Sequence, residues 1–449
     1  MNHTTRNDTH WLLAGALGTL FGLAAGTAAA QDAGPAAPAA PALGAAAYGA
    51  SDPNPYYLGV SEGLTHDSNV FRTPDKKADT YSTTSLFGGF DQRISRQRVF
   101  GKATVGANRY MDRTELNNNS YNLLAGLDWE TIGSLSGNLG LSASQGLSSP
   151  AASGVAVAAT RNLAQTESVD ARIRYGGASL LSIEGALGYS KVNYDDSAYV
   201  TSESKRDSAS LGLYYHPGGP LRLGVAWRVV HTDTPQAFQE VVDGPFLPNT
   251  AKSENLDLTV DYTLTGLVST NARLSYTRQT NSGIVGADFS GLTGSLGINY
   301  RPTGKLSFNL RAARDAGLNA YFFQGEVIEF TNQGPVPTRV TGQYQNSQIT
   351  NLVGLSASYA ATGKISVDAG VSYSRAKLLS TVQRAGFPNQ PGADTTDISK
   401  IAYIGAHWAV ARNWGLGCNL GHEQRDVSGG VNYSYNADTI GCLAQYIWR

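Results

Sequence analysis

The chain has 449 residues, a formal net charge of -1 and only 15% charged residues. The balanced charge gives no reason to expect a nucleic-acid partner, and a mean hydropathy of -0.23 excludes a bundle of membrane-spanning helices. The 51 glycines and 23 tyrosines instead indicate a β-rich chain whose strands carry small polar residues on one face.

The first 30 residues have the layout of a secretory signal peptide. The polar stretch MNHTTRNDTH precedes an apolar segment, WLLAGALGTLFGLAAG, and the small residues TAAA. The apolar segment is shorter than the roughly 20 residues that a transmembrane anchor needs. We therefore predict cleavage after Ala30 and export of the mature chain. Residues 31–55, rich in Ala and Pro, are predicted to form a periplasmic tether, because no pattern in them builds a core.

From residue 56 to residue 449 the chain repeats segments in which apolar and polar residues alternate. In NLDLTVDYTL, Leu256, Leu258 and Val260 fall on one face and Asp257 on the other. About 18 such segments, with roughly 16 as the alternative, are joined by connections that are alternately short and long. The long connections include residues 146–162, 233–252, 318–346 and 378–395. This layout predicts an all-β fold, a single transmembrane antiparallel β-barrel with short periplasmic turns and long extracellular loops.

Aromatic residues recur on the apolar faces near the short turns. They are Trp129, Tyr175, Tyr189, Tyr215, Trp227, Tyr262, Tyr276, Tyr300, Tyr373, Trp408, Trp414 and Tyr446. Such a belt is typical of a barrel at the membrane–water interface, and lipid requires the barrel to be closed. We expect the protein in the outer membrane of a Gram-negative bacterium, with outer-membrane lipid, lipopolysaccharide and the barrel-assembly machinery as partners.

The polar faces are predicted to line a hydrated lumen, since a barrel of this size is wide enough for an aqueous channel. The predicted channel-lining charges are Arg98, Lys102, Asp170, Arg172, Arg174, Arg222, Arg228, Asp257, Asp261, Arg273, Arg301 and Arg311. Arg172, Arg174, Arg222 and Arg228 are candidates for a basic strip that favours anionic solutes. The alternative is that these charges pair with acids on neighbouring strands and only stiffen the wall.

The longest connection, residues 318–346, is apolar and aromatic for a solvated loop. Tyr321, Phe322, Phe323 and Phe330 are candidates for a constriction that folds into the mouth of the barrel, or for stacking on sugar rings. The alternatives are a loop that packs on itself outside the barrel and an outward extension of the hairpin.

The two cysteines, Cys418 and Cys442, lie on the last two predicted strands, on the apolar face and equidistant from Gly430. A tight hairpin centred on Gly430 places them opposite each other, where Cβ atoms are about 4.5–5.5 Å apart. We predict a cross-strand disulfide, which an exported protein can retain. The alternative is two small lipid-facing thiols.

No local pattern signals catalysis or a metal site. None of the five histidines of the exported chain has a zinc-ligand spacing, and neither a Gly-x-Ser-x-Gly motif nor a phosphate-binding loop occurs. His422, followed by Glu423 and surrounded by serines, leaves a lipid hydrolase on the barrel wall as an alternative, because dispersed triads leave no local motif. The sequence predicts no enzyme, no metal and no cofactor.

The stretch LTHDSNVFRTPDKKAD follows the first predicted strand. Asp67 and Asn69 have the spacing of calcium ligands, but Arg72 and Ala78 stand where a calcium loop requires Gly and Glu. Asx-type turns at these two residues explain the reversal of the chain instead. Parity also places Glu62 on the apolar face, which indicates that the first strand bulges or starts late.

The run DSNVFR, residues 67–72, resembles the motif that ends the first strand in β-barrel porin-2 type proteins. Among these the chain most resembles the EpsL-type proteins of exosortase-associated exopolysaccharide operons. The resemblance implies a channel for export of an extracellular polysaccharide, and a general or small-solute diffusion porin is the first alternative. Such barrels commonly end on an aromatic residue, whereas here Arg449 follows Trp448. Tyr446 and Trp448 still supply the aromatic alternation of an assembly signal.

Overall fold

The computed structural model describes residues 55–148, 161–177, 179–239, 245–264, 266–282, 288–316, 321–331, 334–344, 349–378, 381–382, 390–391, 395–428 and 434–448. For the segments between 321 and 344 and between 381 and 391, it describes the backbone alone. The predicted signal peptide, residues 1–30, lies outside the described residues, as does the predicted tether up to residue 54.

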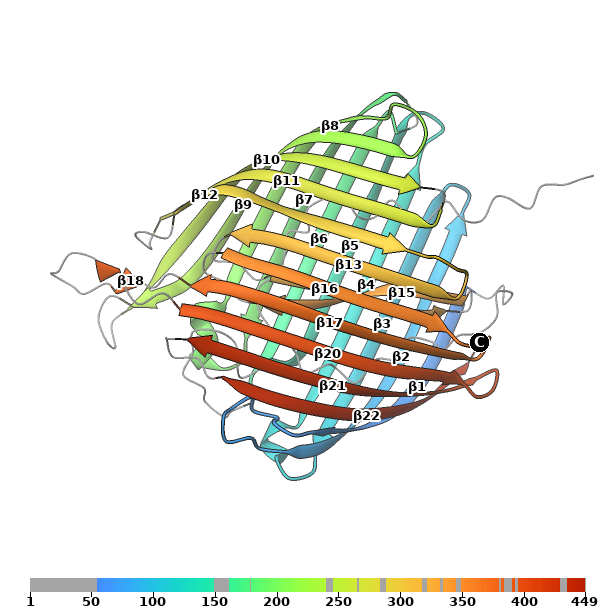
Figure 1. Ribbon diagram of the computed structural model, residues 1–449, viewed down its shortest axis with the longest axis vertical. Coiled ribbons are helices and arrows are strands. Elements are labelled where there is room, and N and C mark those ends of the chain that lie inside the picture. Colours follow the sequence, from blue (N-terminus) through green and yellow to red (C-terminus); the bar gives the residue numbers. More distant parts are fainter. Residues whose placement is uncertain are drawn as a thin grey trace, which may run out of the picture.

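Among the described residues, 18 strands form one antiparallel sheet that closes on itself (Figure 1). β1 (Tyr56–Asp67) pairs with both β2 (Asp79–Ile94) and β22 (Tyr435–Trp448), which joins the first strand to the last. The other barrel strands are β3 (Gln97–Tyr110), β4 (Asn118–Glu130), β5 (Leu135–Leu147), β6 (Leu163–Tyr175), β7 (Leu181–Tyr194), β8 (Ser204–Tyr215), β9 (Leu221–Gln239), β10 (Phe246–Leu264), β11 (Val268–Asn281), β12 (Phe289–Tyr300), β13 (Leu306–Ala316), β16 (Ile349–Ala360), β17 (Ile365–Leu378), β20 (Thr395–Ala409) and β21 (Trp414–Ser428). The predicted all-β barrel is therefore confirmed.

Short turns connect the strands at one end of the barrel, where β1 begins and β22 ends. In the turn between β8 and β9, Gly218 and Gly219 have φ values of 97° and 73°, which side chains disfavour. The long connections at the other end contain the 3-10 helices η1 (Thr114–Leu116) and η2 (Ser197–Ser202) and the hairpins β14 (Tyr321–Thr331)–β15 (Gly334–Tyr344) and β18 (Thr381–Val382)–β19 (Gln390–Pro391). Within the described ranges, no helix has the length and apolarity to cross a bilayer.

The connection predicted for residues 233–252 is largely strand, so this prediction was wrong. β9 runs to Gln239 and β10 begins at Phe246, and the two strands stay paired beyond the rest of the barrel. Their register shifts between Leu247 and Asn249, around Pro248, which has no N–H to donate to the ladder. A hairpin that projects past the apolar belt needs no apolar face, and the search for alternation therefore missed it.

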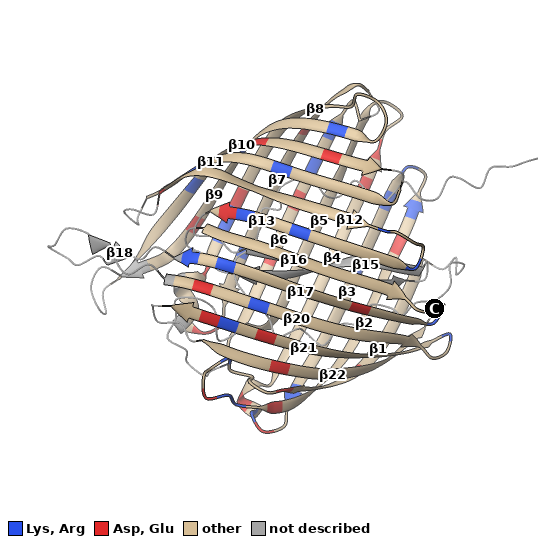
Figure 2. Cartoon of the chain, viewed as in Figure 1, with Lys and Arg blue, Asp and Glu red and all other residues tan. Residues whose placement is uncertain are grey.

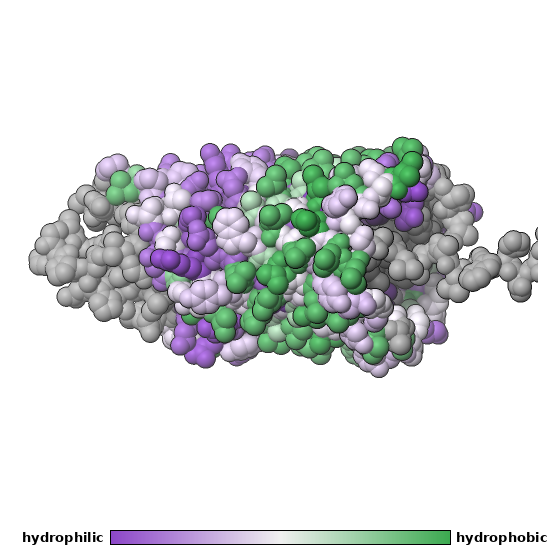
Figure 3. Space-filling model, turned by 90° about the horizontal axis from the view of Figure 1, so that it is seen from above, coloured by the Kyte–Doolittle hydropathy of each residue, from purple (hydrophilic) through white to green (hydrophobic). Residues whose placement is uncertain are grey.

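The outward and inward faces of the barrel differ in exposure and chemistry. On β6, the outward Ile173 and Tyr175 are 53% and 64% exposed, whereas the inward Arg172 side chain is only 10% exposed. In the space-filling view, apolar side chains form a belt and hydrophilic ones gather toward the end with the long connections, on the left (Figure 3). An apolar belt of this extent marks a surface that contacts membrane.

The predicted aromatic belt is present at the short-turn end of the barrel. Close to that end of their strands lie Trp129, Tyr175, Tyr215, Tyr262, Tyr300, Trp408, Trp414 and Tyr446. The prediction was wrong for the other four residues, which lie further from that end of their strands: Tyr189, Trp227, Tyr276 and Tyr373. Parity predicted the correct face for these four, but they lie six to eight residues from the first residue of their strands at the short-turn end, Leu181, Leu221, Val268 and Ile365.

β1 neither bulges nor starts late, contrary to the expectation from Glu62. It pairs residue by residue with β2 and β22 without a shift in register. Glu62 is exposed on the outward face together with Val60 and Leu64. Thr84 on β2 donates a hydrogen bond of 2.6 Å to its carboxylate. The outward acid is therefore a regular feature of the wall, partly satisfied by a neighbouring hydroxyl.

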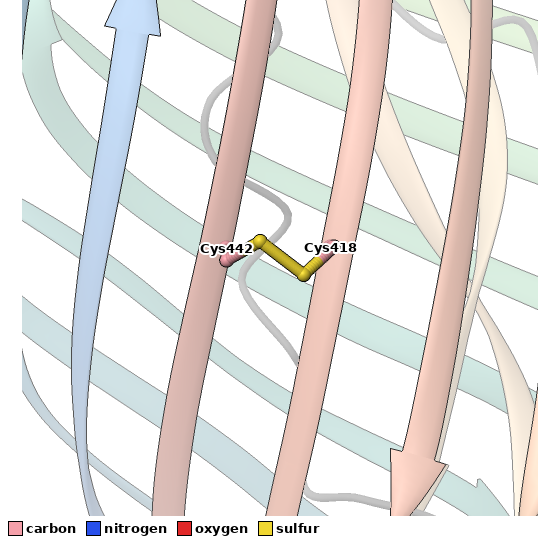
Figure 4. The surroundings of a disulfide bond; sticks show 2 residues. All are labelled: Cys418 and Cys442. Carbon is pink, nitrogen blue, oxygen red and sulfur yellow. A yellow bond between two sulfur atoms is a disulfide. The ribbon is translucent and has the colours of Figure 1, made fainter.

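The two cysteines lie directly opposite each other on β21 and β22, and their sulfur atoms are bonded (Figure 4). Cys418 and Cys442 both lie on the exposed outward face, where parity predicts them. Because β22 also pairs with β1, the disulfide lies beside the seam that closes the barrel.

Candidate functional site

Cationic and anionic residues are interspersed along the strands of the barrel (Figure 2). Strand parity places nearly all the predicted channel-lining charges on the inward face. By alternation with outward apolar residues, the inward positions include Arg98, Lys102, Asp170, Arg172, Arg174, Arg222, Arg228, Asp257, Asp261, Arg273 and Arg311. Arg301 differs, because β12 ends at Tyr300 and Arg301 is exposed in the turn that follows. Because β12 ends one residue earlier than expected, Arg301 does not lie on the inward face.

A closed barrel that is polar inside and apolar outside pairs the backbone groups of its strands without a free edge, as lipid requires. The apolar belt and the aromatic residues at one end complete this arrangement. The chain is an outer-membrane β-barrel. Its short turns accordingly face the periplasm and its long connections face the outside.

One sector of the inward face, from β6 to β11, is rich in arginine. This arginine-rich wall carries Arg172, Arg174, Arg206, Arg222, Arg228 and Arg273 against Asp170, Glu184, Asp257 and Asp261. The cations outnumber the acids, so this side of the lumen is positive.

Glu184 on β7 is the centre of the arginine-rich wall. Its carboxylate lies 3.2, 2.6 and 2.9 Å from the guanidinium groups of Arg172, Arg174 and Arg222, and the residue is 3% exposed. Arg222 also reaches Asp261 at 3.3 Å. Three cations share one buried carboxylate, which leaves an excess of positive charge around Glu184.

A second cluster on the same wall is built around Asp257 on β10. Its carboxylate lies 2.8 Å from Arg228 and 3.9 Å from Arg273. Arg206 on β8 interacts with the charges of both arginines and of Asp315, and its Nε has no hydrogen-bond partner among the described residues. All four arginines of the predicted basic strip are thus paired with acids on nearby strands, which is the pairing that the alternative interpretation expects.

The opposite sector of the inward face, formed by β17, β20, β21, β22 and β1, is rich in acids. This acid-rich wall carries Asp67, Asp368, Asp397 and Glu423 against Arg425 and the loop residue Arg72. Asp397 accepts hydrogen bonds of 3.0 Å from Nε of Arg425, and Asp368 lies 2.8 Å from His407. The strand order places this wall across the barrel from β6–β11, so the lumen has a positive side and a negative side.

The first outer loop, residues 68–78, folds inward onto the acid-rich wall. Arg72, 2% exposed, donates hydrogen bonds of 3.0 and 2.9 Å to Asp67 and of 3.0 Å to Glu423. Tyr435 donates to the other oxygen of Glu423. Burial alone would lower the pKa of Arg72, but the carboxylates of Glu423 and Asp67 raise it above its usual value. Arg72 therefore remains a cation and binds the loop to a strand 351 residues away in the sequence.

Asn69 fixes the same loop to β22. It is completely buried, and its Nδ2 donates to the carbonyl oxygens of Thr73 and Asn436 at 2.7 and 3.0 Å. The backbone N–H of Ser68 donates to the carbonyl of Asp438 at 2.9 Å. The run predicted to be a turn is thus the anchor of a loop that is fixed to the acid-rich wall. Val70 and Phe71, an apolar pair in an otherwise polar loop, were the available sequence signal that this loop packs against the barrel. The partners of Asn69 and Arg72 on distant strands leave no signal in the local sequence.

Two further predictions concern the residues of a candidate loop constriction and a metal site. Tyr321, Phe322, Phe323 and Phe330 lie on β14, whose backbone pairs with β15, and their side chains lie outside the described residues. Among the residues that the structure describes, no cluster of His, Cys, Asp and Glu is arranged to hold a metal ion. The oxygens of Asp67 are occupied by Arg72.

No protein-family model matches the chain, and the search of curated proteins finds no match. Solved structures similar to it include the outer membrane protein OpdK of Pseudomonas aeruginosa, with 12% identity, a TM-score of 0.44 and coverage of 88% of this chain and 99% of that one. The siderophore receptor PirA of Acinetobacter baumannii has 7% identity, a TM-score of 0.42 and coverage of 89% and 81%. OccK2 of Pseudomonas aeruginosa, in complex with glucuronate, has 11% identity, a TM-score of 0.42 and coverage of 89% and 99%. Similarities of this size assign no function to this chain.

Proposed function

We propose that this barrel is a diffusion channel for small hydrophilic solutes. The observation that carries the proposal is the inward face, on which a positive wall and a negative wall lie across the lumen from each other. A barrel of about 16–18 strands is wide enough for water between such walls. Passage through it makes and breaks no covalent bond.

The first outer loop limits the size of the solute. Arg72 and Asn69 are buried and hydrogen-bonded to strands on the acid-rich wall, so the loop is a fixed part of the entrance. We expect a loop that is fixed to the wall at this end of the barrel to favour small solutes over a bulky polymer.

The two walls also orient a solute that carries both charges. Its anionic group is attracted to the arginine-rich wall, where the Arg222 guanidinium lies 3.7 Å from the centre of the Tyr214 ring, and its cationic group to the acid-rich wall. We infer that small zwitterions, such as free amino acids, pass more readily than ions that carry a single charge of either sign.

Liposome swelling and planar-bilayer conductance test the proposal. The mature barrel is reconstituted and exposed to sugars of increasing size, and to zwitterionic amino acids and monovalent ions of matched mass. Swelling is expected to fall steeply with sugar size and to be faster for zwitterions than for the matched ions. A reconstituted, folded barrel that neither conducts nor supports swelling would exclude a diffusion channel.

Export of an extracellular polysaccharide is the second candidate, and the resemblance of the run DSNVFR to EpsL-type proteins favours it. Asp67, Asn69 and Arg72 of this run bind one another and neighbouring strands, a structural role that either function requires. Deleting the gene and measuring surface polysaccharide separates the two candidates. Unchanged polysaccharide with reduced solute uptake supports the diffusion channel, and lost polysaccharide with unchanged uptake supports export.

A lipid hydrolase on the outward face is the third candidate. His422 Nδ1 lies 2.6 Å from Asp438 Oδ1, and both side chains are exposed, an arrangement that hydrolases use to orient a general base. In the described contacts, the other ring nitrogen has no hydroxyl partner that would serve as a nucleophile. We therefore place this candidate last. Fatty acid released from vesicles by the wild type but not by His422→Ala would reverse that order.

A further inference from the structure

A long groove of about 850 Å³ crosses the outward face of the barrel from β13 to β1. It follows a row of residues that are paired in register across neighbouring strands. The row begins at Phe308, passes Ala357, Ala369 and Leu420, and ends at His66. The small alanine side chains between larger apolar neighbours form the floor of the groove.

The groove rises from the periplasmic side of the membrane toward the outside. Phe308 lies close to the periplasmic end of β13, Ala369 lies in the periplasmic half of β17, and His66 is next to the last residue of β1. Because barrel strands are tilted, a row that crosses them runs obliquely through the membrane. The apolar part of the groove therefore lies at the depth of acyl chains, and its end at His66 lies near the outer headgroups.

The charged and imidazole side chains that line the groove lie at this outer end. His66 is joined there by His422 and Asp438, whose side chains are 52% and 67% exposed and 2.6 Å apart. Further out on the same face, Lys400 pairs with Asp426 at 3.1 Å. Donors and acceptors are thus exposed side by side at the end of an otherwise apolar groove. This distribution matches an amphipathic molecule with one apolar chain and a headgroup that both donates and accepts hydrogen bonds.

We propose that the groove binds one lipopolysaccharide molecule of the outer leaflet. One acyl chain lies along the alanine floor, and the phosphorylated sugar headgroup lies at His66, His422 and Lys400. The phosphate suits the imidazoles and the lysine amine, and the sugar hydroxyls suit the carboxylates of Asp438 and Asp426. A phospholipid of the inner leaflet would place its headgroup at the Phe308 end, where the described lining is apolar.

Retention of lipopolysaccharide by the purified barrel tests this proposal. The full-length mature protein is extracted from outer membranes in mild detergent, and bound lipopolysaccharide is counted by native mass spectrometry. Ala369→Trp fills the groove, and Ala272→Trp places the same ring on the outward face of β11 as a matched control. The gel mobility of unheated samples verifies that each barrel is folded. We expect Ala369→Trp to retain roughly tenfold less lipopolysaccharide than the control, because the ring displaces several methylenes of the acyl chain.

A second pair of measurements locates the headgroup and identifies the lipid. His422→Ala combined with Lys400→Ala leaves the groove open and is also expected to lose lipopolysaccharide. Delipidated barrel is then titrated separately with lipopolysaccharide and with phosphatidylethanolamine. Equal retention by Ala369→Trp and Ala272→Trp, unchanged retention in the double variant, or equally tight binding of phosphatidylethanolamine would each overturn the proposal.

Discussion

The two inward walls hold their charges by different means. On the arginine-rich wall, the ion pairs join residues of regular strands, as Glu184 on β7 does with Arg174 on β6. On the acid-rich wall, the cation Arg72 comes from the first outer loop and joins Asp67 to Glu423. A charge on the arginine-rich wall can be removed without moving the backbone, so these ion pairs mainly set the electric field in the lumen. The Arg72 ion pairs on the acid-rich wall fix the path of the first outer loop, so we expect them to affect the free energy of unfolding and the shape of the mouth.

Arg72→Ala breaks the acid-rich wall and is the change from which we expect the largest effect. Removing one member of a buried ion pair leaves the carboxylates of Asp67 and Glu423 uncompensated, which costs about 3–5 kcal/mol. The denaturant midpoint of the barrel refolded in detergent measures this loss. Lys77→Ala is the control in the same loop, because Lys77 pairs with Asp75 at an exposed position, and no measurable change is expected. Equal midpoints for the two variants would show that the wall does not depend on the loop.

The disulfide next to the acid-rich wall tests whether the closing seam needs a covalent link. The bridge spans a sequence separation of 24 residues, and its constraint on the unfolded chain contributes about 3–4 kcal/mol. Replacing Cys418 and Cys442 by serine is expected to lower the free energy of unfolding by this amount, which is measured as a lower denaturant midpoint. Wild-type protein in reductant should match the variant. Two reactive thiols in purified, unreduced protein would contradict the bridge.

Glu62→Gln examines the outward face of the same seam and should have a smaller effect of opposite sign. A neutral amide is less costly against lipid than a carboxylate and can still accept the hydrogen bond from Thr84, so stability should rise by up to about 1 kcal/mol. Glu254→Gln is the control, since Glu254 pairs with Lys252 on the exposed outer part of β10, and its midpoint should not change. A fall in the midpoint of Glu62→Gln would show that the charge itself is required at this position.

The fold was predictable because it depends on alternation along single strands and on pairing between neighbours in the sequence. The same parity predicted which face carries Cys418 and Cys442. It did not reveal the long β9–β10 hairpin, which continues past the apolar belt, or the regular pairing of β1 around Glu62. In both places, the ladder of backbone hydrogen bonds continues where the hydrophobic pattern stops, so alternation of apolar and polar residues does not reveal it.

The candidate site was less predictable, because its contacts depend on closure of the barrel. Arg172 and Arg222 were placed on the inward face, but their shared partner Glu184 depends on how three strands are staggered. The pairing of Arg72 with Glu423 is more remote still, since it exists only when β1 meets β22 in the observed register. The run that includes Arg72 was therefore interpreted as a turn, although its residues bind two further strands.

Arg174→Gln and Asp368→Asn form a matched pair that compares the two walls directly and should have the smallest effects in free energy. Arg174 is one of three cations around Glu184, so its loss leaves that carboxylate with two partners. Asp368 lies 2.8 Å from His407, a contact that an amide can keep. Neither substitution should move the backbone, so each acts through the charge that it removes.

The reversal potential in a salt gradient measures the result. Arg174→Gln should shift the selectivity toward cations and Asp368→Asn toward anions, each by about twofold in permeability ratio. The effect is small because the interaction of one wall charge with a permeating ion in water is worth less than about 1 kcal/mol. The double variant should return close to wild type, since the two shifts oppose each other. Both shifts should shrink at about 1 M salt, where the screening length falls to about 3 Å. Shifts of the same sign would exclude a lumen with a positive and a negative side, and shifts independent of salt would exclude an effect of the field.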